Sequence, residues 1–280
     1  VIGLSNIGDA VLMSPVIHAL HAAAPAATLT LVVGERARPL FERDPRVQRL
    51  VVMEEFAGWR GRLRLVGWLW QQRPDALIDL RQTLLPLVWR PWRAWRYMRP
   101  VPRRLRHMRE RHLWKLRVQV PGVANGSRAD HACPLAWTPR ESAHVDQLWK
   151  RWSLDEALPA VLICPGARSH IKRWTAEGFA QVADRLMAEA GVSVIFSGEP
   201  DEEPVIEAIR ALMRGRAHSA VGLTTVRQLG LLMQRVRLVI TNDSASLHLA
   251  SAAGVPTVAV FGPTDEAKYG PTAPGSRTIR

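Results

Sequence analysis

The stretch 238–265, LVITNDSASLHLASAAGVPTVAVFGPTD, constrains the fold of this chain more than any other. Its pattern is that of a strand, a polar loop at 242–244, a helix, a second strand and a second loop. Gly254 stands where a helix commonly ends. A parallel strand–helix–strand unit brings both loops to one edge of the sheet, where α/β proteins bind ligands. The helix start after Asp243 offers free backbone N–H groups and a positive dipole end, which suit a phosphate.

A second loop strengthens this interpretation. The sequence ICPGARSHIKRW at 163–174 also follows an apolar strand, and its loop carries Lys172. An ordinary strand–helix–strand unit with a capping aspartate would explain the first stretch alone. The lysine in the second loop favours an edge that binds an anion.

Three signatures occur in one order along the chain. They are IGDAV at 7–11 with PVIHAL at 15–20, PGA at 165–167 with KRW at 172–174, and DSASLH at 243–248 with AAGVP at 252–256 and FGPTD at 261–265. Together they resemble the signatures of glycosyltransferase family 9, the lipopolysaccharide heptosyltransferases. The middle of the chain, 59–152, matches that family only loosely.

Strand and helix patterns alternate through both halves, which predicts an α/β fold with parallel sheets. The expected strands are 1–4, 28–33, 47–53, 76–80, 160–164, 192–197, 217–221, 238–241 and 257–261. Thr175 and Thr225 are expected to cap helices. Pro15 suits an early helical position, so the first helix is expected to begin near Ser14.

The resemblance implies a GT-B-like architecture of two Rossmann-like domains with parallel sheets facing a cleft. We expect an acceptor-binding domain at 1–152, a linker at 153–159 and a nucleotide-sugar-binding domain at 160–280. The chain begins at Val1 within the expected first strand and stops at Arg280. We therefore expect a chain truncated at both ends.

The formal net charge of +13 is concentrated in one segment. Residues 59–117 contain 16 Lys or Arg and three Asp or Glu, so the rest of the chain is neutral. Trp89, Trp92 and Trp95 alternate with arginines there. Three interpretations stay open: a solvated helical surface, a patch that lies on anionic membrane lipid, and a nucleic-acid-binding surface. The resemblance favours the membrane and no nucleic acid, because the acceptor would be an acidic lipid-linked saccharide.

The cysteines and the hydropathy bear on the compartment. Cys133 and Cys164 provide neither a disulfide framework nor a metal-binding spacing, which favours a reducing cytosol. No apolar run of about 18 residues predicts a transmembrane helix. The resemblance implies a cytoplasmic protein in peripheral contact with the inner face of the inner membrane.

The resemblance also implies an inverting enzyme that moves heptose from ADP-heptose to a lipopolysaccharide core acceptor, with neither metal nor cofactor. Two alternatives stay open: a non-catalytic protein that binds a nucleotide sugar or an anionic lipid, and another GT-B-type nucleotide-sugar enzyme. The first is favoured by Ala245, which stands where the family usually has glycine, after Ser244 in place of threonine. Alanine tolerates a positive φ poorly, so we expect a displaced loop or weaker donor binding.

The expected catalytic base is Asp9, which would take the proton of the acceptor hydroxyl; its plainer interpretation is a helix-capping or first-turn acid. Gly8 and Arg81 are the expected acceptor-binding residues. Lys172 would stabilise the leaving diphosphate, unless it is only a surface lysine. His248 would touch the donor, unless it only packs within its helix. The expected donor-binding residues are Arg168, Ser169, Lys172, Glu202, Asp243, Ser244, Ala245, Ser246, Leu247 and His248.

Overall fold

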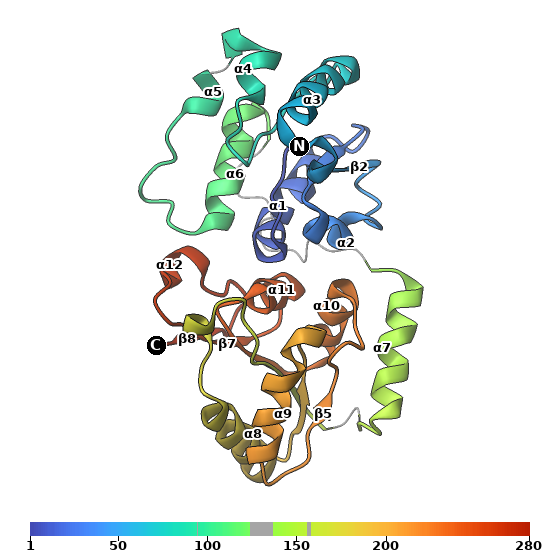
Figure 1. Ribbon diagram of the computed structural model, residues 1–280, viewed down its shortest axis with the longest axis vertical. Helices are drawn as coiled ribbons and strands as arrows, with labels where there is room; N and C mark the ends of the chain where they lie inside the picture. Colours follow the sequence, from blue (N-terminus) through green and yellow to red (C-terminus); the bar gives the residue numbers. More distant parts are fainter. Residues whose placement is uncertain (94, 124–136, 156–157) are drawn as a thin grey trace. The chain divides into compact units, whose positions relative to one another are not determined.

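The computed structural model describes every residue except 94, 124–136 and 156–157, the last of which fall in the expected linker. The chain divides into two compact units, Val1–Ala136 and Trp137–Arg280 (Figure 1). Each unit holds parallel strands and flanking helices, which confirms the predicted α/β class.

The division between the units differs from the expected linker at 153–159. Helix α7 (Pro139–Arg151) precedes that segment, yet it packs on α10 (Val226–Arg235) of the second unit. Glu141 of α7 and Arg227 of α10 form an ion pair in which both side chains are buried. Because separating a buried charge pair is costly, α7 belongs with the second unit.

The first unit is built on a small parallel sheet. β1 (Thr30–Val33) pairs in parallel with β2 (Arg49–Val52). Ile2 forms parallel bridges with Val32 of β1 and with Asp79. The first and fourth predicted strands of this half are therefore short bridges that extend the β1–β2 pair.

Helices pack on this small sheet. They are α1 (Ile7–Ala23), α2 (Arg38–Phe41), α3 (Gly58–Gln72), α4 (Leu85–Trp89), α5 (Trp95–Met98) and α6 (Met108–Gln119), with 3-10 turns at Glu35–Ala37, Met53–Phe56 and Pro91–Arg93. α1 packs on α6, and α3 packs on α4. One core cluster joins Ile2, Val32 and Val51 of the sheet to Leu65 and Leu69 of α3.

Helix α1 begins at Ile7, well before the predicted start near Ser14, and Pro15 lies inside it. A proline has no N–H to donate to the carbonyl four residues earlier, which here is that of Val11. The Ser14 hydroxyl donates to the Val11 carbonyl at 2.6 Å instead. That carbonyl is therefore satisfied, and the helix continues through the proline.

Among its described residues, the second unit holds six parallel strands in the order β5-β4-β3-β6-β7-β8. They are β3 (Ala160–Cys164), β4 (Ser193–Phe196), β5 (His218–Ser219), β6 (Leu238–Asn242), β7 (Thr257–Val260) and β8 (Arg277–Ile279). The five strands predicted for this half are present, and β8 is an addition. This is the order of a Rossmann sheet, whose ligand crevice lies outside the carboxyl ends of the two central strands, here β3 and β6.

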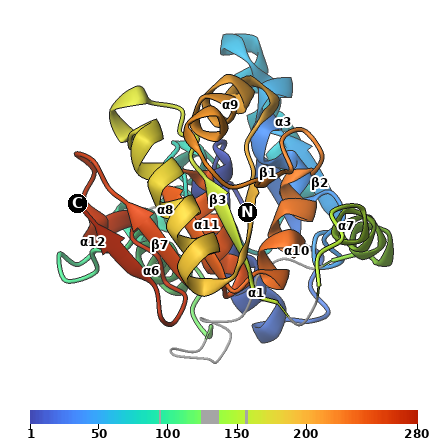
Figure 2. The same ribbon diagram turned by 90° about the horizontal axis from the view of Figure 1, so that it is seen from below.

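Helices lie on both faces of this sheet. They are α8 (Ala176–Ala190), α9 (Glu203–Leu212), α10, α11 (Ala245–Ala253) and α12 (Glu266–Tyr269), with 3-10 turns at His170–Lys172 and Pro200–Glu202. α8 and α9 pack on one face, where their apolar side chains join Val161, Ile163 and Phe196 in one core cluster (Figure 2). Right-handed crossovers place α10 and α11 on the other face.

The three helix caps predicted for the second unit are present. Thr175 accepts a hydrogen bond from the Gly178 N–H, and Thr225 forms a capping box with Gln228. Gly254 ends α11 with a φ of 76°, in the left-handed region that glycine favours. These caps fix where α8, α10 and α11 begin or end.

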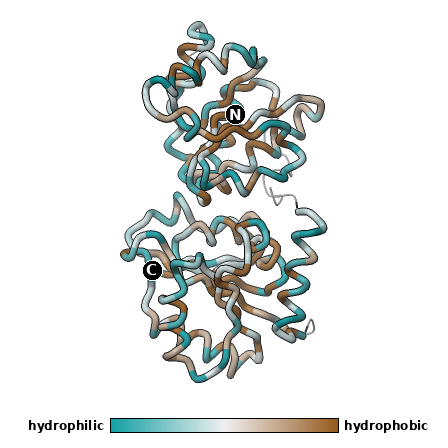
Figure 3. The backbone as a smooth tube through the Cα atoms, turned by 45° about the vertical axis from the view of Figure 1, so that its right-hand side comes forward, coloured by the Kyte–Doolittle hydropathy of each residue, from teal (hydrophilic) through white to brown (hydrophobic). Residues whose placement is uncertain are grey.

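Hydrophobic residues gather where the first strands of the first unit run, beside the N-terminus (Figure 3). The buried core residues of both units are spread over short strands and helices, and α1 is buried on all sides from Ala10 to Ile17. No helix in the described parts of the chain is long and apolar enough to cross a bilayer.

Candidate active site

The carboxyl ends of β3 and β6 lie side by side, since Cys164 pairs in register with Thr241. The loop after β3 leads to the turn His170–Lys172. Asn242 ends β6 and is followed directly by Asp243 and α11. This edge is where an open α/β sheet of this strand order binds its ligand.

Lys172 and Asp243 bring the two loops into contact. The Lys172 Nζ donates a hydrogen bond to Asp243 Oδ2 at 2.6 Å. The side chain of Asp243 is 4% exposed, whereas that of Lys172 is 32% exposed. The Asp243 N–H donates to the Val260 carbonyl at 3.1 Å, which anchors the aspartate to β7. The buried carboxylate thus holds the ammonium at the sheet edge, where part of the lysine stays open to a ligand.

Asn242 connects the two ends of the lysine loop, and it is fully buried. Its Nδ2 donates to the Pro165 carbonyl at 2.6 Å, and its Oδ1 accepts from the Trp174 N–H at 3.0 Å. Pro165 opens the loop that carries Lys172, and Trp174 closes it. Asn242 is absent from the predicted site residues. The sequence signal that could have found it is an amide at the end of an apolar strand, since such a buried side chain must have partners.

The start of α11 presents backbone N–H groups at the same edge. Ser244 is the N-cap, with an extended backbone (φ −140°), and its side chain makes no capping hydrogen bond. The Ser244 hydroxyl lies 3.3 Å from the Thr241 hydroxyl instead. The first N–H groups of a helix have no partner within the helix, so this helix start is suited to a phosphate.

Ala245 does not strain this loop. It is the first residue of α11 and has a right-handed helical backbone, a conformation that alanine favours. Ala245 therefore lacks the positive φ that alanine tolerates poorly. Weaker donor binding at this position stays a prediction.

Glu202 approaches the lysine loop from the turn Pro200–Glu202. A Cβ at Gly166 would lie 1.9 Å from Glu202 Oε1, so this carboxylate lies directly against the glycine and a larger residue there would displace it. Glu202 Oε2 accepts from the Glu199 N–H at 2.9 Å. Burial raises the pKa of the Glu202 carboxyl, and the Glu199 N–H opposes that rise. The structure thus brings Glu202 to the same loop as Lys172.

Ser246 and Cys164 interact at the end of β3. Burial raises the pKa of the Cys164 thiol to about 12, against the opposing effect of its hydrogen bond with Ser246. A thiol with so high a pKa is a poor nucleophile, so Cys164 acts here as a small buried hydrophobic residue. The backbone N–H of Ser246 can still bind a nucleotide-sugar donor. Cys133 lies outside the described residues.

Arg168 and Ser169 lie on the lysine loop itself. Arg168 is exposed, and Ser169 is half-buried. The Ser169 carbonyl accepts from the Lys172 N–H at 3.1 Å, which shapes the turn before Lys172. The Arg173 Nε donates to the Ala167 carbonyl at 2.8 Å. The loop is therefore held internally as well as through Asn242.

Leu247 and His248 lie within α11, where packing dominates their surroundings. Leu247 is fully buried in a cluster with Ala259 and Phe261. Its buried side chain cannot contact a nucleotide-sugar donor, so only its backbone N–H is available for the expected donor binding. His248 is 7% exposed, and its ring centroid lies 6.3 Å from that of Tyr269.

Asp9 lies in the first turn of α1, beside Gly8, with Asn6 as the N-cap. The Asn6 Nδ2 donates to Asp9 Oδ2 at 3.2 Å. Asp9 is half-buried, and no Lys or Arg in the described ranges of the chain forms an ion pair with it. The helix follows the segment around Ile2, so Asp9 stands at the carboxyl end of a strand. The geometry accommodates both a first-turn acid and a base.

Asp79 is a second strand-end acid of the first unit, and it is absent from the predicted site. Its carboxylate accepts from the Arg81 N–H at 3.0 Å and from the Thr83 N–H at 2.6 Å. The Gln119 side chain bonds both its backbone N–H and its carbonyl. Burial raises the pKa of Asp79, and the Thr83 hydrogen bonds oppose that rise. Asp79 thereby shapes the loop on which Arg81 is exposed; an acid directly after an apolar run is the signal that could have found it.

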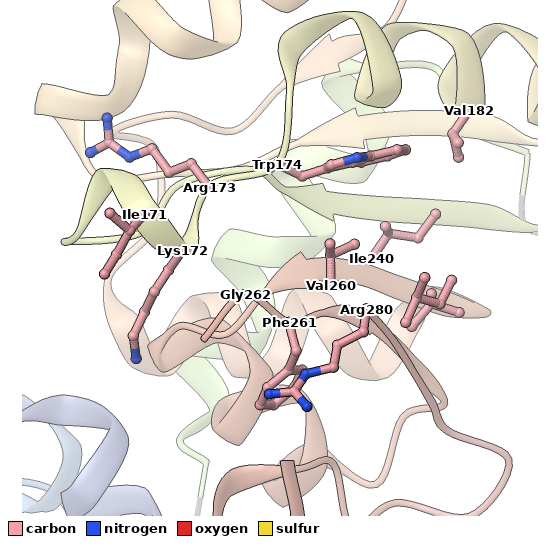
Figure 4. A pocket seen from close by; sticks show the side chains of 12 residues that line it. Ile171, Lys172, Arg173, Trp174, Val182, Ile240, Val260, Phe261, Gly262 and Arg280 are labelled. Carbon is pink, nitrogen blue, oxygen red and sulfur yellow. The ribbon is translucent and has the colours of Figure 1, made fainter. Parts of the chain in front are cut away.

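A pocket of about 460 Å³ in the second unit is lined on one side by residues 171–174 of the lysine loop, and most of its lining is apolar. Figure 4 shows Trp174, Val182 and Ile240 close together, whereas the charged ends of Lys172 and Arg173 point away from them. Apolar walls do not solvate a diphosphate. The edge at Lys172 and the start of α11, rather than this pocket, is therefore the candidate phosphate site.

Comparison with known proteins agrees with the resemblance. The profile of glycosyltransferase family 9 (heptosyltransferase) matches residues 131–280, which is more than half of the chain. Lipopolysaccharide heptosyltransferase 2 of Escherichia coli strain K12 is 26% identical over 308 aligned positions, which span 100% of this chain and 87% of that protein. Lipopolysaccharide core heptosyltransferase OpsX of Haemophilus influenzae is 25% identical over 276 positions, which span 93% of this chain and 78% of that protein.

Solved structures of the same family share the fold. The glycosyl transferase family 9 protein of Veillonella parvula has a TM-score of 0.84 at 23% identity, covering 99% of this chain and 86% of that one. The E. coli ADP-heptose lps heptosyltransferase II has a TM-score of 0.71 at 23% identity, covering 100% and 90%. The E. coli heptosyltransferase WaaC with ADP has a TM-score of 0.71 at 16% identity, covering 100% and 92%. This likeness shows a GT-B-like fold of two Rossmann-like domains. The family profile matches the second unit, and the fold of the solved structures covers the whole length. The chain therefore belongs to glycosyltransferase family 9 (heptosyltransferase) and is a glycosyltransferase.

Proposed function

We propose that this enzyme transfers heptose from ADP-heptose to an acidic, lipid-linked saccharide of the lipopolysaccharide core, with inversion at the anomeric carbon. The observation that carries the proposal is the Lys172–Asp243 pair, 2.6 Å apart, directly before α11 at the switch point of the Rossmann sheet. The names of the relatives support the substrate class, since one is a lipopolysaccharide heptosyltransferase and the solved WaaC structure contains ADP.

The donor's diphosphate would lie between Lys172 and the start of α11. As the bond from the sugar to the phosphate breaks, negative charge grows on the departing ADP, and a fixed cation and oriented N–H groups stabilise that charge. Lys172 has three N–H donors, one of which Asp243 already accepts. Asp243 would therefore orient the Lys172 ammonium. The two remaining N–H groups of that ammonium would bind phosphate oxygens of the donor. Arg168, Ser169 and the N–H groups of 244–247 would complete this site.

Asp9 would be the general base. One of its carboxylate oxygens accepts from Asn6, and the other would take the proton from the acceptor hydroxyl. The acceptor oxygen then forms its bond to the anomeric carbon on the face opposite the departing ADP, which inverts the configuration. A general base of this kind contributes about 10²–10⁴-fold to the rate.

The remaining predicted residues have supporting roles in this proposal. Gly8 next to Asp9, and the exposed Arg81, would contact the acceptor, with Arg81 attracting its acidic groups. Glu202, with one oxygen beside Gly166, would accept hydroxyl groups of the donor. His248 would touch the donor from the first turns of α11.

Because the proposed acceptor is lipid-linked, the enzyme would act at a membrane surface. We propose a cytoplasmic enzyme in peripheral contact with the inner face of the inner membrane. The charge distribution supports this, because 59–117 alone holds the excess of positive charge, and positive segments are attracted to anionic headgroups.

The test is an assay of the purified protein with a lipopolysaccharide core acceptor that lacks the heptose. ADP-heptose, UDP-glucose and GDP-mannose are supplied in parallel, and the products are analysed by mass spectrometry and by the anomeric NMR coupling. The proposal expects transfer from ADP-heptose alone, with inversion. Transfer from another donor, or with retention, would overturn the corresponding part of the proposal.

A further inference from the structure

We propose that α3, α4 and α5 form a docking face, defined as the exposed side chains of residues 58–93 and 95–99, which lies on an anionic bilayer with its apolar side chains inserted. The inference rests on the proposed function, because it names the surface that would hold the enzyme at its lipid-linked acceptor. Every exposed large hydrophobic side chain in the described part of the first unit lies within this segment. The most exposed are Trp59, Leu63, Trp70, Leu84, Trp92 and Met98.

Helix α3 has two apolar stripes, of which the core uses one. Leu65 and Leu69 are buried and pack in the core cluster of the first unit. Trp59, Leu63 and Trp70 are 68%, 63% and 59% exposed. Their spacing of four and then seven residues places them on one face of the helix. That face has no partner among the described residues, so the helix is built to bury a second apolar surface.

The segment after α3 adds further exposed apolar side chains. α4 packs on α3, and Leu85 and Trp89 of α4 join the same core cluster as α3. Leu84, Trp92 and Met98 are 72%, 69% and 72% exposed. Figure 1 shows α3, α4 and α5 grouped at one end of the first unit. Leu85 and Trp89, which pack in the core, thus attach to the first unit a segment that carries exposed apolar side chains.

The charges between these apolar groups are positive and uncompensated. Residues 59–99 contain nine arginines and two acids, Asp75 and Asp79, and Asp79 is buried. None of these nine arginines forms an ion pair with a carboxylate in the described structure. Several lie over neighbouring rings instead, such as Arg60 at 5.2 Å from the Trp59 ring centroid and Arg96 at 5.4 Å from that of Trp95. An anionic surface is the complementary partner.

The side-chain chemistry favours lipid over nucleic acid. Single-stranded nucleic acid binds to aromatic platforms, on which bases stack. Leu63, Leu84 and Met98 offer no such platform, but they gain from transfer into the acyl boundary of a membrane. Tryptophan is the residue that prefers the membrane–water interface, and arginine pairs with the phosphate of a headgroup.

The experiment measures binding to vesicles of phosphatidylcholine with and without phosphatidylglycerol. The wild type is expected to bind only the vesicles with phosphatidylglycerol, and more weakly as salt rises. The triple variant Trp59→Ser, Leu63→Ser, Trp70→Ser should bind at least roughly tenfold more weakly. Its control is Leu212→Ser, since Leu212 is 52% exposed in the second unit.

A second variant removes charge in place of apolar surface. Arg93→Gln, Arg96→Gln and Arg99→Gln together should weaken binding roughly a hundredfold, whereas the exposed pair Arg214→Gln, Arg216→Gln should leave it unchanged. Equal binding to pure phosphatidylcholine, unchanged binding by either variant, or tighter binding to a single-stranded RNA than to vesicles would overturn the docking face.

Transfer to a soluble, delipidated core acceptor separates this inference from the proposed function. Both variants should keep that transfer while they lose vesicle binding. Loss of both would assign the surface to acceptor binding and overturn its docking role. If the wild type binds vesicles as described yet transfers no heptose, the proposed function fails while the docking face stands.

Discussion

Asn242 and Trp174, 68 positions apart in the chain, are joined by a hydrogen bond of 3.0 Å from the Trp174 N–H to the Asn242 Oδ1. The same amide donates to the Pro165 carbonyl. One buried side chain at the end of β6 therefore fixes both ends of the loop that carries Lys172. The next residue, Asp243, fixes the Lys172 ammonium itself.

Replacing Asn242 by alanine should affect both stability and donor binding. The change leaves two backbone groups without a partner, which costs about 1–3 kcal/mol for a buried polar group. It also frees the lysine loop, so we expect ADP to bind about tenfold more weakly. Urea unfolding and calorimetric titration measure the two effects. The exposed Gln181→Ala on α8 is the control, and an Asn242→Ala protein with wild-type ADP affinity would show that the loop needs no such anchor.

The Arg227–Glu141 pair should dominate the attachment of α7. Both side chains are almost inaccessible, at 2% and 5% exposed. Arg227→Met leaves the Glu141 charge buried without its partner, which costs about 3–5 kcal/mol. Arg210→Met is the matched control, because the Arg210–Glu207 pair is exposed and such pairs contribute at most about 1 kcal/mol. Equal losses in the two variants, measured by chemical unfolding, would contradict a structural role for the buried pair.

Glu141 should make stability depend on pH in the acid range. Burial alone would raise the pKa of its carboxyl, but the hydrogen bonds from Arg227 and Thr138 outweigh burial and lower the pKa to about 2. A carboxyl whose folded pKa is depressed stabilises the protein above its unfolded pKa of about 4.3. That contribution is lost as the pH falls from about 4.3 to about 2.

The comparison that isolates this effect is between the wild type and Glu141→Gln. The wild type should be more stable at pH 6, and the difference in unfolding free energy should shrink progressively below pH 4. A difference that stays constant down to pH 2 would mean that the Glu141 charge does not contribute to stability.

Asp9→Asn should lower turnover by about 10²–10⁴-fold, the usual share of a general base. The amide keeps the size of the side chain and accepts the hydrogen bond from Asn6, but it cannot take a proton. ADP affinity and the melting temperature should therefore stay close to those of the wild type. A variant that retains full transfer would remove Asp9 as the base, and one that fails to fold would make Asp9 a structural first-turn acid.

The sequence predicts the second unit well because its signals are local. Alternating apolar runs, Thr175, Thr225 and Gly254 each act through their own turn of backbone, and each is found where predicted. β8 escapes prediction because Arg277-Thr278-Ile279 is short and has no apolar run. It is a strand through its pairing with β7.

Sequence patterns predict the structure less well where contacts beyond the local pattern determine the position of an element or the role of a side chain. The start of α1 depends on the hydrogen bond from Ser14 to the carbonyl that Pro15 leaves free. The placement of α7 depends on a partner, Arg227, that lies 86 positions away. Asn242 likewise matters through contacts that no local pattern contains, whereas Lys172 and Asp243 could be predicted because a family signature marks each of their loops.

The central claim is that the donor's diphosphate binds at Lys172 beside the start of α11. Calorimetric titration of ADP into the wild type and into Lys172→Ala tests it most directly, with Lys150→Ala on the exposed surface of α7 as the control. The account predicts that Lys172→Ala weakens ADP binding by about 1.5–3 kcal/mol, the contribution of a hydrogen bond to a charged group, and that Lys150→Ala binds ADP like the wild type. Unchanged ADP affinity in a folded Lys172→Ala protein would contradict the account.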